Sequence, residues 1–248
     1  MKVVYVLCMR QLKRYFRARS RIIGSLGQPL LFLLAVGFGF GPTFKKAGGG
    51  NYIQFLAPGI VLMGILFTAV FSGIEIIWDR QFGFLKETLV APVSRFQIVL
   101  GRTLGGATVA IIQGFLVLAI CFVAGFRIED PKMFPVALMF MCLCSVLFTS
   151  LGTAIGSILE DMQSFPLIMN FVVMPLFFFS GALFPVHGLP KALQIAIRLD
   201  PLTYGVDGLR GSFGHTSQFG LGVDMAVLGV LTVILLAIGS YLFSKIQL

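Results

Sequence analysis

Charged side chains are scarce in this chain of 248 residues: Asp, Glu, Lys and Arg make up 12% of it, and hydrophobic residues make up 57%. A soluble globular domain carries roughly 25% charged residues. The scarcity therefore excludes an ordinary soluble fold and leaves six long runs without Asp, Glu, Lys or Arg. They are 22–44, 47–74, 103–126, 133–159, 162–190 and 225–244. Each run is long enough to cross a bilayer, and none alternates as a barrel strand does, so they predict membrane helices.

The motifs of the common enzyme classes are also missing. The sequence has no G-x-x-x-x-G-K-[ST] loop for phosphate, no G-x-S-x-G nucleophile motif and no H-E-x-x-H zinc motif. His187 and His215 lack metal-ligand spacing, and the four cysteines form no C-x-x-C pair. We therefore expect no catalytic residue, metal site, bound cofactor or disulfide framework in this chain.

The net charge of +9 lies at the ends of the predicted spans rather than on one face, so nucleic acid is not the expected partner. With the N-terminus inside, the inner segments hold twelve Lys and Arg residues and the outer segments hold seven. The positive-inside rule then places both termini in the cytoplasm. Seven basic residues precede the first apolar run, unlike a cleaved signal peptide, so we expect this span to be retained. The expected location is the cytoplasmic membrane of a bacterium or archaeon.

The expected fold class is an all-α membrane protein with six transmembrane helices. They lie at about 22–41, 53–78, 99–125, 134–159, 163–183 and 223–244. Pro29 is expected to disturb the first span. Gly101, Gly105 and Gly106 on the third span, and a stripe of small polar residues on the fourth, favour close helix packing over a pathway lining. The stripe is Ser145, Thr149, Thr153 and Ser157.

Residues 1–21 are expected to form an amphipathic interfacial helix, followed by a six-span membrane domain over 22–248. The apolar and basic faces of this N-terminal helix follow helical spacing. The apolar face consists of Tyr5, Cys8, Leu12 and Tyr15. The basic face consists of Arg10, Arg14, Arg17 and Arg21. The arginines would face anionic lipid; alternatively they only set the topology.

Glu75 is the exception among the uncharged spans. It lies one turn before Trp78 and Asp79, which places it at the inner interface and predicts a local ion pair with Arg80 or another basic residue. A gating role inside the membrane is the alternative.

Two segments between spans are too apolar for plain loops. The inner segment 79–98 contains a short amphipathic stretch that ends at Pro92, with Phe82, Phe84, Leu85, Leu89 and Val90 expected to seat it and Gln81, Lys86, Glu87 and Arg95 expected to face the cytosol. A solvated loop is the alternative. The outer segment 184–222 predicts two short helices that meet near Asp200 and Pro201 and dip into the outer leaflet. Its apolar residues are Phe184, Leu189, Leu193, Ile197 and Leu199, beside a polar stripe of Lys191, Gln194 and Arg198.

Several motifs resemble those of the ABC type-2 transporter permease family. Pro201-Leu-Thr-Tyr204 followed by Arg210 resembles its signature, and 179–185 and Leu189-Pro190 precede it. The stretches 55–60 (FLAPGI) and 89–95 (LVAPVSR) also resemble members of the family. The resemblance covers nearly the whole chain in order and is nearest to exporters of nodulation factors and anthracycline-type drugs. Arg210 is expected to be structural, paired with a backbone carbonyl or an acid; a ligand role is the alternative.

The resemblance implies an exporter of an amphipathic drug, lipid or lipid-linked glycan. It implies two permease chains, expected as a homodimer, and two cytosolic ATPase subunits that bind ATP and Mg²⁺. It also implies that segment 79–98 contacts the ATPase. The residues expected at that contact are Phe84, Leu85, Lys86, Glu87 and Arg95. Two rival functions remain: a secondary transporter or channel, which would need ion-coupling acids in its spans, and a non-transporting membrane scaffold.

Overall fold

The computed structural model describes residues 2–46, 51–90, 92–185, 190–215 and 217–246. His187, Leu189 and the side chain of Leu89, on which the sequence analysis placed expectations, lie outside the described residues. Within the described ranges every regular element is helical and no strand occurs, so the all-α prediction is confirmed.

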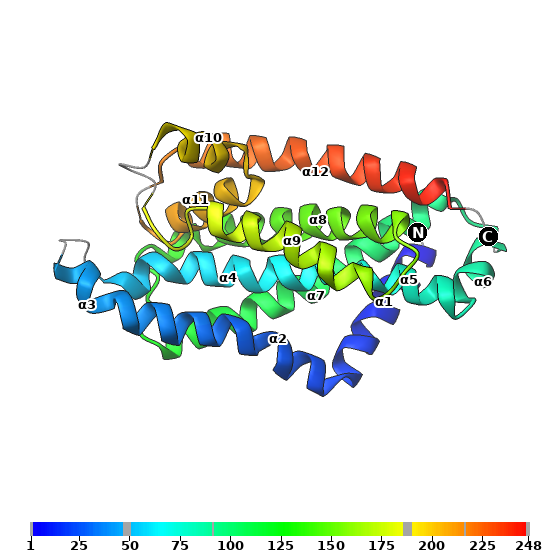
Figure 1. Cartoon of the computed structure of the whole chain (residues 1–248), viewed down its shortest axis with the longest axis horizontal. Helices are drawn as coiled ribbons and strands as arrows, with labels where there is room; N and C mark the ends of the chain where they lie inside the picture. The colour runs from blue at the N-terminus through cyan, green and yellow to red at the C-terminus, as the bar shows by residue number, and fades with distance from the viewer. Residues whose placement is uncertain (1, 47–50, 91, 186–189, 216, 247–248) are drawn as a thin grey trace.

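In chain order the helices are α1 (Lys2–Arg17), α2 (Arg19–Phe32), η1 (Leu33–Phe38, a π-helix), α3 (Gly39–Lys46), α4 (Tyr52–Phe71), α5 (Ile74–Gln81), α6 (Phe84–Val90), α7 (Arg95–Val123), η2 (Pro131–Met133, a 3₁₀ turn), α8 (Phe134–Ile158), α9 (Ser164–Phe179), α10 (Lys191–Leu199), α11 (Pro201–Ser212) and α12 (Leu221–Ser244). The long helices run side by side as a bundle, with α6 and both chain ends at one end and α3, α10 and α11 at the other (Figure 1). We call these the inner end and the outer end, after the predicted topology.

Five helical stretches in the described part of the chain are long and apolar enough to cross a membrane. They are Arg19–Lys46, Tyr52–Gln81, Arg95–Val123, Pro131–Ile158 and Leu221–Ser244. The chain is therefore a multi-pass membrane protein. The fifth predicted span, 163–183, is a shorter apolar helix of 16 residues, α9.

Helix α4 forms the centre of the bundle. Every residue from Leu56 to Leu66 is buried, so the helix has neighbours around its whole circumference. It packs against α2, α7, α8, α9 and α11. Because lipid chains are as apolar as leucine, burial in a membrane is held by close packing rather than by exclusion of water.

Glycines on α7 supply such close packing. A Cβ on Gly101 would lie 3.0 Å from Leu7 of α1, and a Cβ on Gly105 would lie 3.0 Å from Gln11. Gly106 faces the opposite neighbours, α4 and α8. The prediction that small residues on the third span let other helices approach is confirmed, and α1 is one of the helices that approach.

The small polar stripe of α8 is buried along its whole length. Ser145 and Ser157 donate their hydroxyls to carbonyls of their own helix, those of Cys142 and Thr153. Thr149 and Thr153 are also buried. The predicted packing role of the stripe is confirmed.

The first span differs from expectation at two places. Residues 42–46, which lie beyond the predicted first span of 22–41, continue the helix as the end of α3. The disturbance expected at Pro29 lies four residues further on, where Leu33–Phe38 widens into a π-helix. Proline cannot donate a backbone hydrogen bond, and local π adjustments are one way in which membrane helices accommodate it.

Candidate coupling and transport site

Two acids on α5 meet four arginines from three other helices at the inner end. Asp79 accepts hydrogen bonds from Arg10 at 2.8 Å and from Arg102 at 2.5 Å. Glu75, one turn earlier, forms ion pairs with Arg14 at 3.5 Å and with Arg21 at 3.4 Å. We call these six residues the charge cluster. Its ion pairs link α1, α2 and α7 to α5.

These ion pairs matter for the stability of the fold because both acids and Arg102 are buried. Asp79 is 3% exposed, Arg102 is 4% exposed and Glu75 is 7% exposed. A buried charge that loses its partner is strongly destabilising, whereas a paired one is tolerated. Among the described residues no group of three or more His, Cys, Asp or Glu could hold a metal ion. The two acids are paired with arginines.

The predicted ion pair of Glu75 with a basic residue is confirmed, but its partners come from α1 and α2. Arg80 instead lies 3.7 Å from Glu160 across the inner surface. The expectation that the α1 arginines face lipid is wrong for Arg10 and Arg14, which face the two acids.

Sequence reasoning missed Asp79 and Arg102 as members of the cluster. One signal was available: Glu75 and Asp79 are four residues apart, and so are Arg10 and Arg14. Two i,i+4 pairs of opposite charge put complementary faces on two helices. Nothing in the sequence, however, brought α1 next to α5.

Helix α1 has a second anchor near its end. The hydroxyl of the buried Tyr15 donates to Oε1 of Gln113 on α7 at 2.6 Å. Burial raises the pKa of Tyr15, while Arg21 opposes the shift, so the hydroxyl keeps its proton at neutral pH. Together with the glycine contacts, this bond places α1 against α7 along most of its length.

One face of helix α6 is exposed, and the opposite face is packed against the bundle. Phe84, Lys86 and Glu87 are exposed, whereas Leu85 is completely buried beside Ile76, Ile98 and Phe243. The expectation that Leu85 contacts another subunit is therefore corrected, because its side chain is already enclosed by this chain. The Arg10 guanidinium lies 4.7 Å from the centre of the Phe84 ring, so α6 adjoins the charge cluster.

The seating of the inner segment also differs from expectation. Phe82, Phe84 and Val90 were expected to hold it against the bundle, yet all three are exposed. Arg95 was expected to face the cytosol and to contact the ATPase. Its guanidinium instead donates to the carbonyls of Ser244 and Ile246, which ties the start of α7 to the end of α12.

A cavity of about 520 Å³ lies beside the charge cluster, between α1–α2, α4–α5 and α9. We call it the inner cavity. Its lining combines polar side chains with large aromatic ones. They include Arg21, Gln28, Thr68 and Asn170, and Phe67, Phe71 and Trp78. Arg21 belongs to both the cavity and the cluster, so a movement of one changes the other.

At the outer end, the motif Pro201–Tyr204 forms the elbow between α10 and α11, the two short helices predicted for this segment. Asp200 caps α11 by accepting from the backbone N–H of Leu202 at 2.8 Å, and Pro201 takes the first helical position, where its missing N–H costs nothing. The hydroxyls of Thr203 and Tyr204 bind carbonyls of α10 at 2.7 and 2.8 Å. The motif therefore sets the angle between the two helices.

Arg210 joins three of the motifs singled out in the sequence. Its guanidinium donates to the carbonyls of Phe55 and Gly181, each at 3.3 Å, and lies 4.0 Å from the centre of the Phe55 ring. A Cβ on Gly59 would lie only 2.5 Å from the Cβ of Ala182. The carbonyl partner predicted for Arg210 is present, and the motifs 55–60, 179–185 and 201–210 form one packed junction.

Comparison with known proteins gives a consistent result. A family model described as ABC-2 type transporter matches residues 2–213. The putative transport permease ycf38 of Cyanophora paradoxa is 30% identical over 221 residues, 86% of this chain and 75% of that protein. Nodulation protein J of Rhizobium leguminosarum bv. trifolii is 30% identical over 195 residues, 78% of this chain and 74% of that protein. The inner membrane transport permease YadH of Escherichia coli (strain K12) is 27% identical over 219 residues, 88% of this chain and 83% of that protein.

The matched region contains the charge cluster, α6 and the junction around Arg210. The resemblance that the sequence motifs indicate is confirmed over most of the chain. The chain belongs to the ABC-2 type transporter family.

Proposed function

We propose that this chain is the permease subunit of an ATP-driven exporter, that two copies form the pathway, and that separate ATPase subunits bind ATP and Mg²⁺ and drive it. The observation that carries the proposal is α6, whose Phe84, Lys86 and Glu87 face outward while Leu85 is enclosed by the bundle. A short helix exposed on one side and fixed on the other is suited to receive a partner's movement. Family membership supports an ATPase as that partner.

The charge cluster can transmit a movement of α6 to the other helices of the bundle. Displacement of α6 acts on Arg10 through the Phe84 ring, and Arg10 shares Asp79 with Arg102 of α7. Glu75, one turn before Asp79 on α5, is paired with Arg21, which lines the inner cavity. A shift of α5 relative to α1 and α7 therefore changes the shape of the inner cavity.

The charge cluster gives no support to a secondary transporter or channel. Such a mechanism needs acids that are free to bind and release an ion. Glu75 and Asp79 are both held by arginines at 2.5 to 3.5 Å.

The inner cavity supports an amphipathic cargo. Its aromatic side chains can bury an apolar body, and its few polar groups can orient a head group, which is the usual composition of a small-molecule site. Its volume of about 520 Å³ lies within the range of roughly 300–1,000 Å³ typical of such sites.

The proposed topology has six crossings, with α1 along the inner membrane surface and both termini in the cytoplasm. Arg95 at the start of α7 binds carbonyls at the end of α12, so these two points lie on the same side. Between them, α7, α8 and α12 make three crossings, and only a fourth crossing by α9 returns the chain to the starting side. At 1.5 Å per residue its 16 residues are about 24 Å long, slightly short of the hydrocarbon core of about 30 Å.

Cysteine labelling tests this topology. In a variant free of the four native cysteines, a cysteine at Ser94 is expected to be reached only from the cytoplasmic side, and one at Glu129 only from outside. Both positions are exposed, next to opposite ends of α7. Labelling of both from the same side would contradict the assignment.

We also propose that α10 dips into the outer leaflet. Leu193, Ile195 and Leu199 are exposed on it, with Leu199 78% exposed. A helix that leaves large aliphatic side chains uncovered fits lipid better than water. Lys191 and Arg198 can reach the head groups.

Uncoupling variants test the role of α6. The double variant Phe84→Ala, Glu87→Lys removes the exposed ring and reverses a charge without touching Leu85. We expect it to insert and fold normally but to lose the ATPase on purification, or to show at least about tenfold less cargo-stimulated ATP hydrolysis, as is usual when interface residues that carry most of the binding energy are truncated.

The matched control makes similar changes at the outer end, on α10: Leu193→Ala with Lys191→Glu. It should leave ATPase binding and stimulated hydrolysis unchanged. If the α6 variant keeps full ATPase binding and full coupling, α6 is only a surface helix and the proposal fails.

A further inference from the structure

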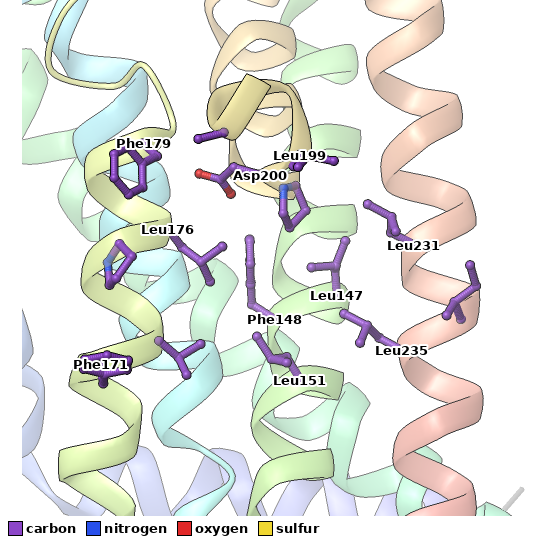
Figure 2. A pocket seen from close by; sticks show the side chains of 15 residues that line it. Leu147, Phe148, Leu151, Phe171, Leu176, Phe179, Leu199, Asp200, Leu231 and Leu235 are labelled. Carbon is purple, nitrogen blue, oxygen red and sulfur yellow. The ribbon is translucent and has the colours of Figure 1, made fainter. Parts of the chain in front are cut away.

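A second cavity, of about 710 Å³, lies toward the outer end of the bundle and is separate from the inner cavity. Its walls are α8, α9 and α12, and the elbow between α10 and α11 closes its outer end (Figure 2). We call it the outer cavity. Helices α9 and α12 make no extensive contact with each other among the described residues, so α8 forms the back of the cavity between them.

The outer cavity is apolar along almost its whole length. Of its fifteen lining residues, Asp200 alone has a polar side chain. Leu147, Leu176 and Leu235 line the middle of it, one from each wall. Phe171 of α9 and Ile234 of α12 line it and are exposed on helices embedded in the membrane. The occupant most available at such a site is a component of the bilayer.

Asp200 gives the outer cavity one polar end. Figure 2 places it at the elbow, between Phe179 and Leu199. Its Oδ1 accepts from the Leu202 N–H, whereas Oδ2 has no hydrogen-bond partner among the described residues, although Asp200 is only 5% exposed. A buried polar atom without a partner is costly, so a ligand that binds Oδ2 is favoured.

The protonation state of Asp200 indicates what that ligand must offer. Asp200 lies in the turn outside the spanning helices, and burial raises its pKa to about 8, against the opposing effect of the Leu202 N–H. At neutral pH the carboxyl is therefore mostly protonated and can donate a hydrogen bond from Oδ2 to a ligand. The ligand must combine a long apolar body with a hydrogen-bond acceptor at its outer end.

We propose that the outer cavity binds one acyl chain of a membrane glycerolipid, with the ester carbonyl of that chain accepting a hydrogen bond from the Asp200 carboxyl. The apolar walls enclose the hydrocarbon, and the single polar group lies where the chain joins its head group. The bound lipid fills the space between α9, α12 and the elbow, so it links the outer helices to the bundle. This site does not depend on which cargo the inner cavity accepts.

Native mass spectrometry of the purified protein tests the site with a defined lipid. The protein is delipidated and then incubated with dioleoyl phosphatidylcholine, which has ester carbonyls but no N–H donor, or with its dialkyl ether analogue, which lacks the carbonyls. We expect one retained molecule per chain with the ester lipid, and about fivefold weaker retention of the ether lipid, the effect of one hydrogen bond.

Variants locate the binding. Leu235→Trp places a bulky ring in the middle of the outer cavity, where it obstructs the path of an acyl chain, and should abolish retention, whereas Val233→Trp, on the exposed side of the same helix, should behave as the wild type. Asp200→Asn keeps both the helix cap and a donor and should retain the preference for the ester lipid. Asp200→Ser keeps the helix cap but has no atom in the place of Oδ2. This variant should bind the ester lipid and the ether lipid equally. If the Leu235→Trp protein is not monodisperse, the retention measurement is made instead with Leu231→Phe, which adds less side-chain volume to the same cavity.

Three results would overturn the proposal. Retention unchanged in the Leu235→Trp protein would place the lipid elsewhere. Dissociation of oligomers by Leu235→Trp with unchanged lipid would make the cavity an interface between copies of the chain. Retention of phosphatidylethanolamine but not of phosphatidylcholine, lost in Asp200→Asn, would mean that Asp200 accepts from an ammonium group rather than donates to an ester.

Discussion

Replacing Asp79 with Asn is expected to destabilise the folded protein by about 3–5 kcal/mol, the usual cost of removing one partner of a buried ion pair. Arg102 is 4% exposed and has Asp79 as its only ion-pair partner among the described residues, so the variant leaves a buried guanidinium uncompensated. Asn is almost isosteric, which separates the loss of charge from a change in packing. In detergent, the melting temperature should fall by on the order of 10 °C.

Two companion variants show that the buried pair causes this effect. Glu160→Gln removes the acid of the Arg80 pair on the inner surface, where Glu160 is 84% exposed, and should leave the melting temperature unchanged. Arg102→Met in the Asp79→Asn background removes the uncompensated charge and should restore much of the lost stability, because a well-packed apolar residue often replaces a buried charge without loss. Equal melting temperatures for Asp79→Asn and Glu160→Gln would contradict the assigned role of the cluster.

The spans were predictable because run length and charge scarcity are local properties. About twenty uncharged residues predict a membrane helix whatever surrounds them, and five of the six predicted spans appear as helices of that kind among the described residues, the sixth being the shorter helix α9. The elbow at Asp200 was predictable for the same reason, since a cap followed by proline marks a helix start in sequence alone. The π-helix at Leu33–Phe38 was not, because it depends on how neighbouring helices accommodate Pro29.

The candidate site was predicted less well because it depends on contacts between distant segments. Arg10 and Asp79 are 69 residues apart, and the packing of α1 against α7, through Gly101, Gly105 and the Tyr15–Gln113 bond, helps to bring them together. Leu85 was assigned to a partner because an amphipathic helix seen in sequence does not show which face its own chain covers. The outer cavity has no sequence signal, since its walls come from three helices whose apolar residues resemble those of any span.

The largest packing effect is expected where α8 crosses the break between α4 and α5. A Cβ on Gly152 would lie 2.3 Å from the carbonyl oxygen of Val70, and a Cβ on Gly73 would lie 2.0 Å from the carbonyl oxygen of Gly152. Both obstacles are backbone atoms, which cannot move aside as a flexible side chain can. Gly152→Ala should therefore cost about 3 kcal/mol or more, the upper part of the range for overpacking.

The matched control is Gly229→Ala on α12, where a Cβ would meet no atom within 4 Å. Alanine is the better helix former, so this variant should be neutral or stabilised by up to about 1 kcal/mol. The two proteins are compared by melting temperature and by the fraction that elutes as a single species in detergent. Because α5 carries both acids of the charge cluster, Gly152→Ala should also lower cargo-stimulated ATP hydrolysis in whatever folded fraction remains. A Gly152→Ala protein as stable and as active as Gly229→Ala would show that α8 does not hold α5 in place through this contact.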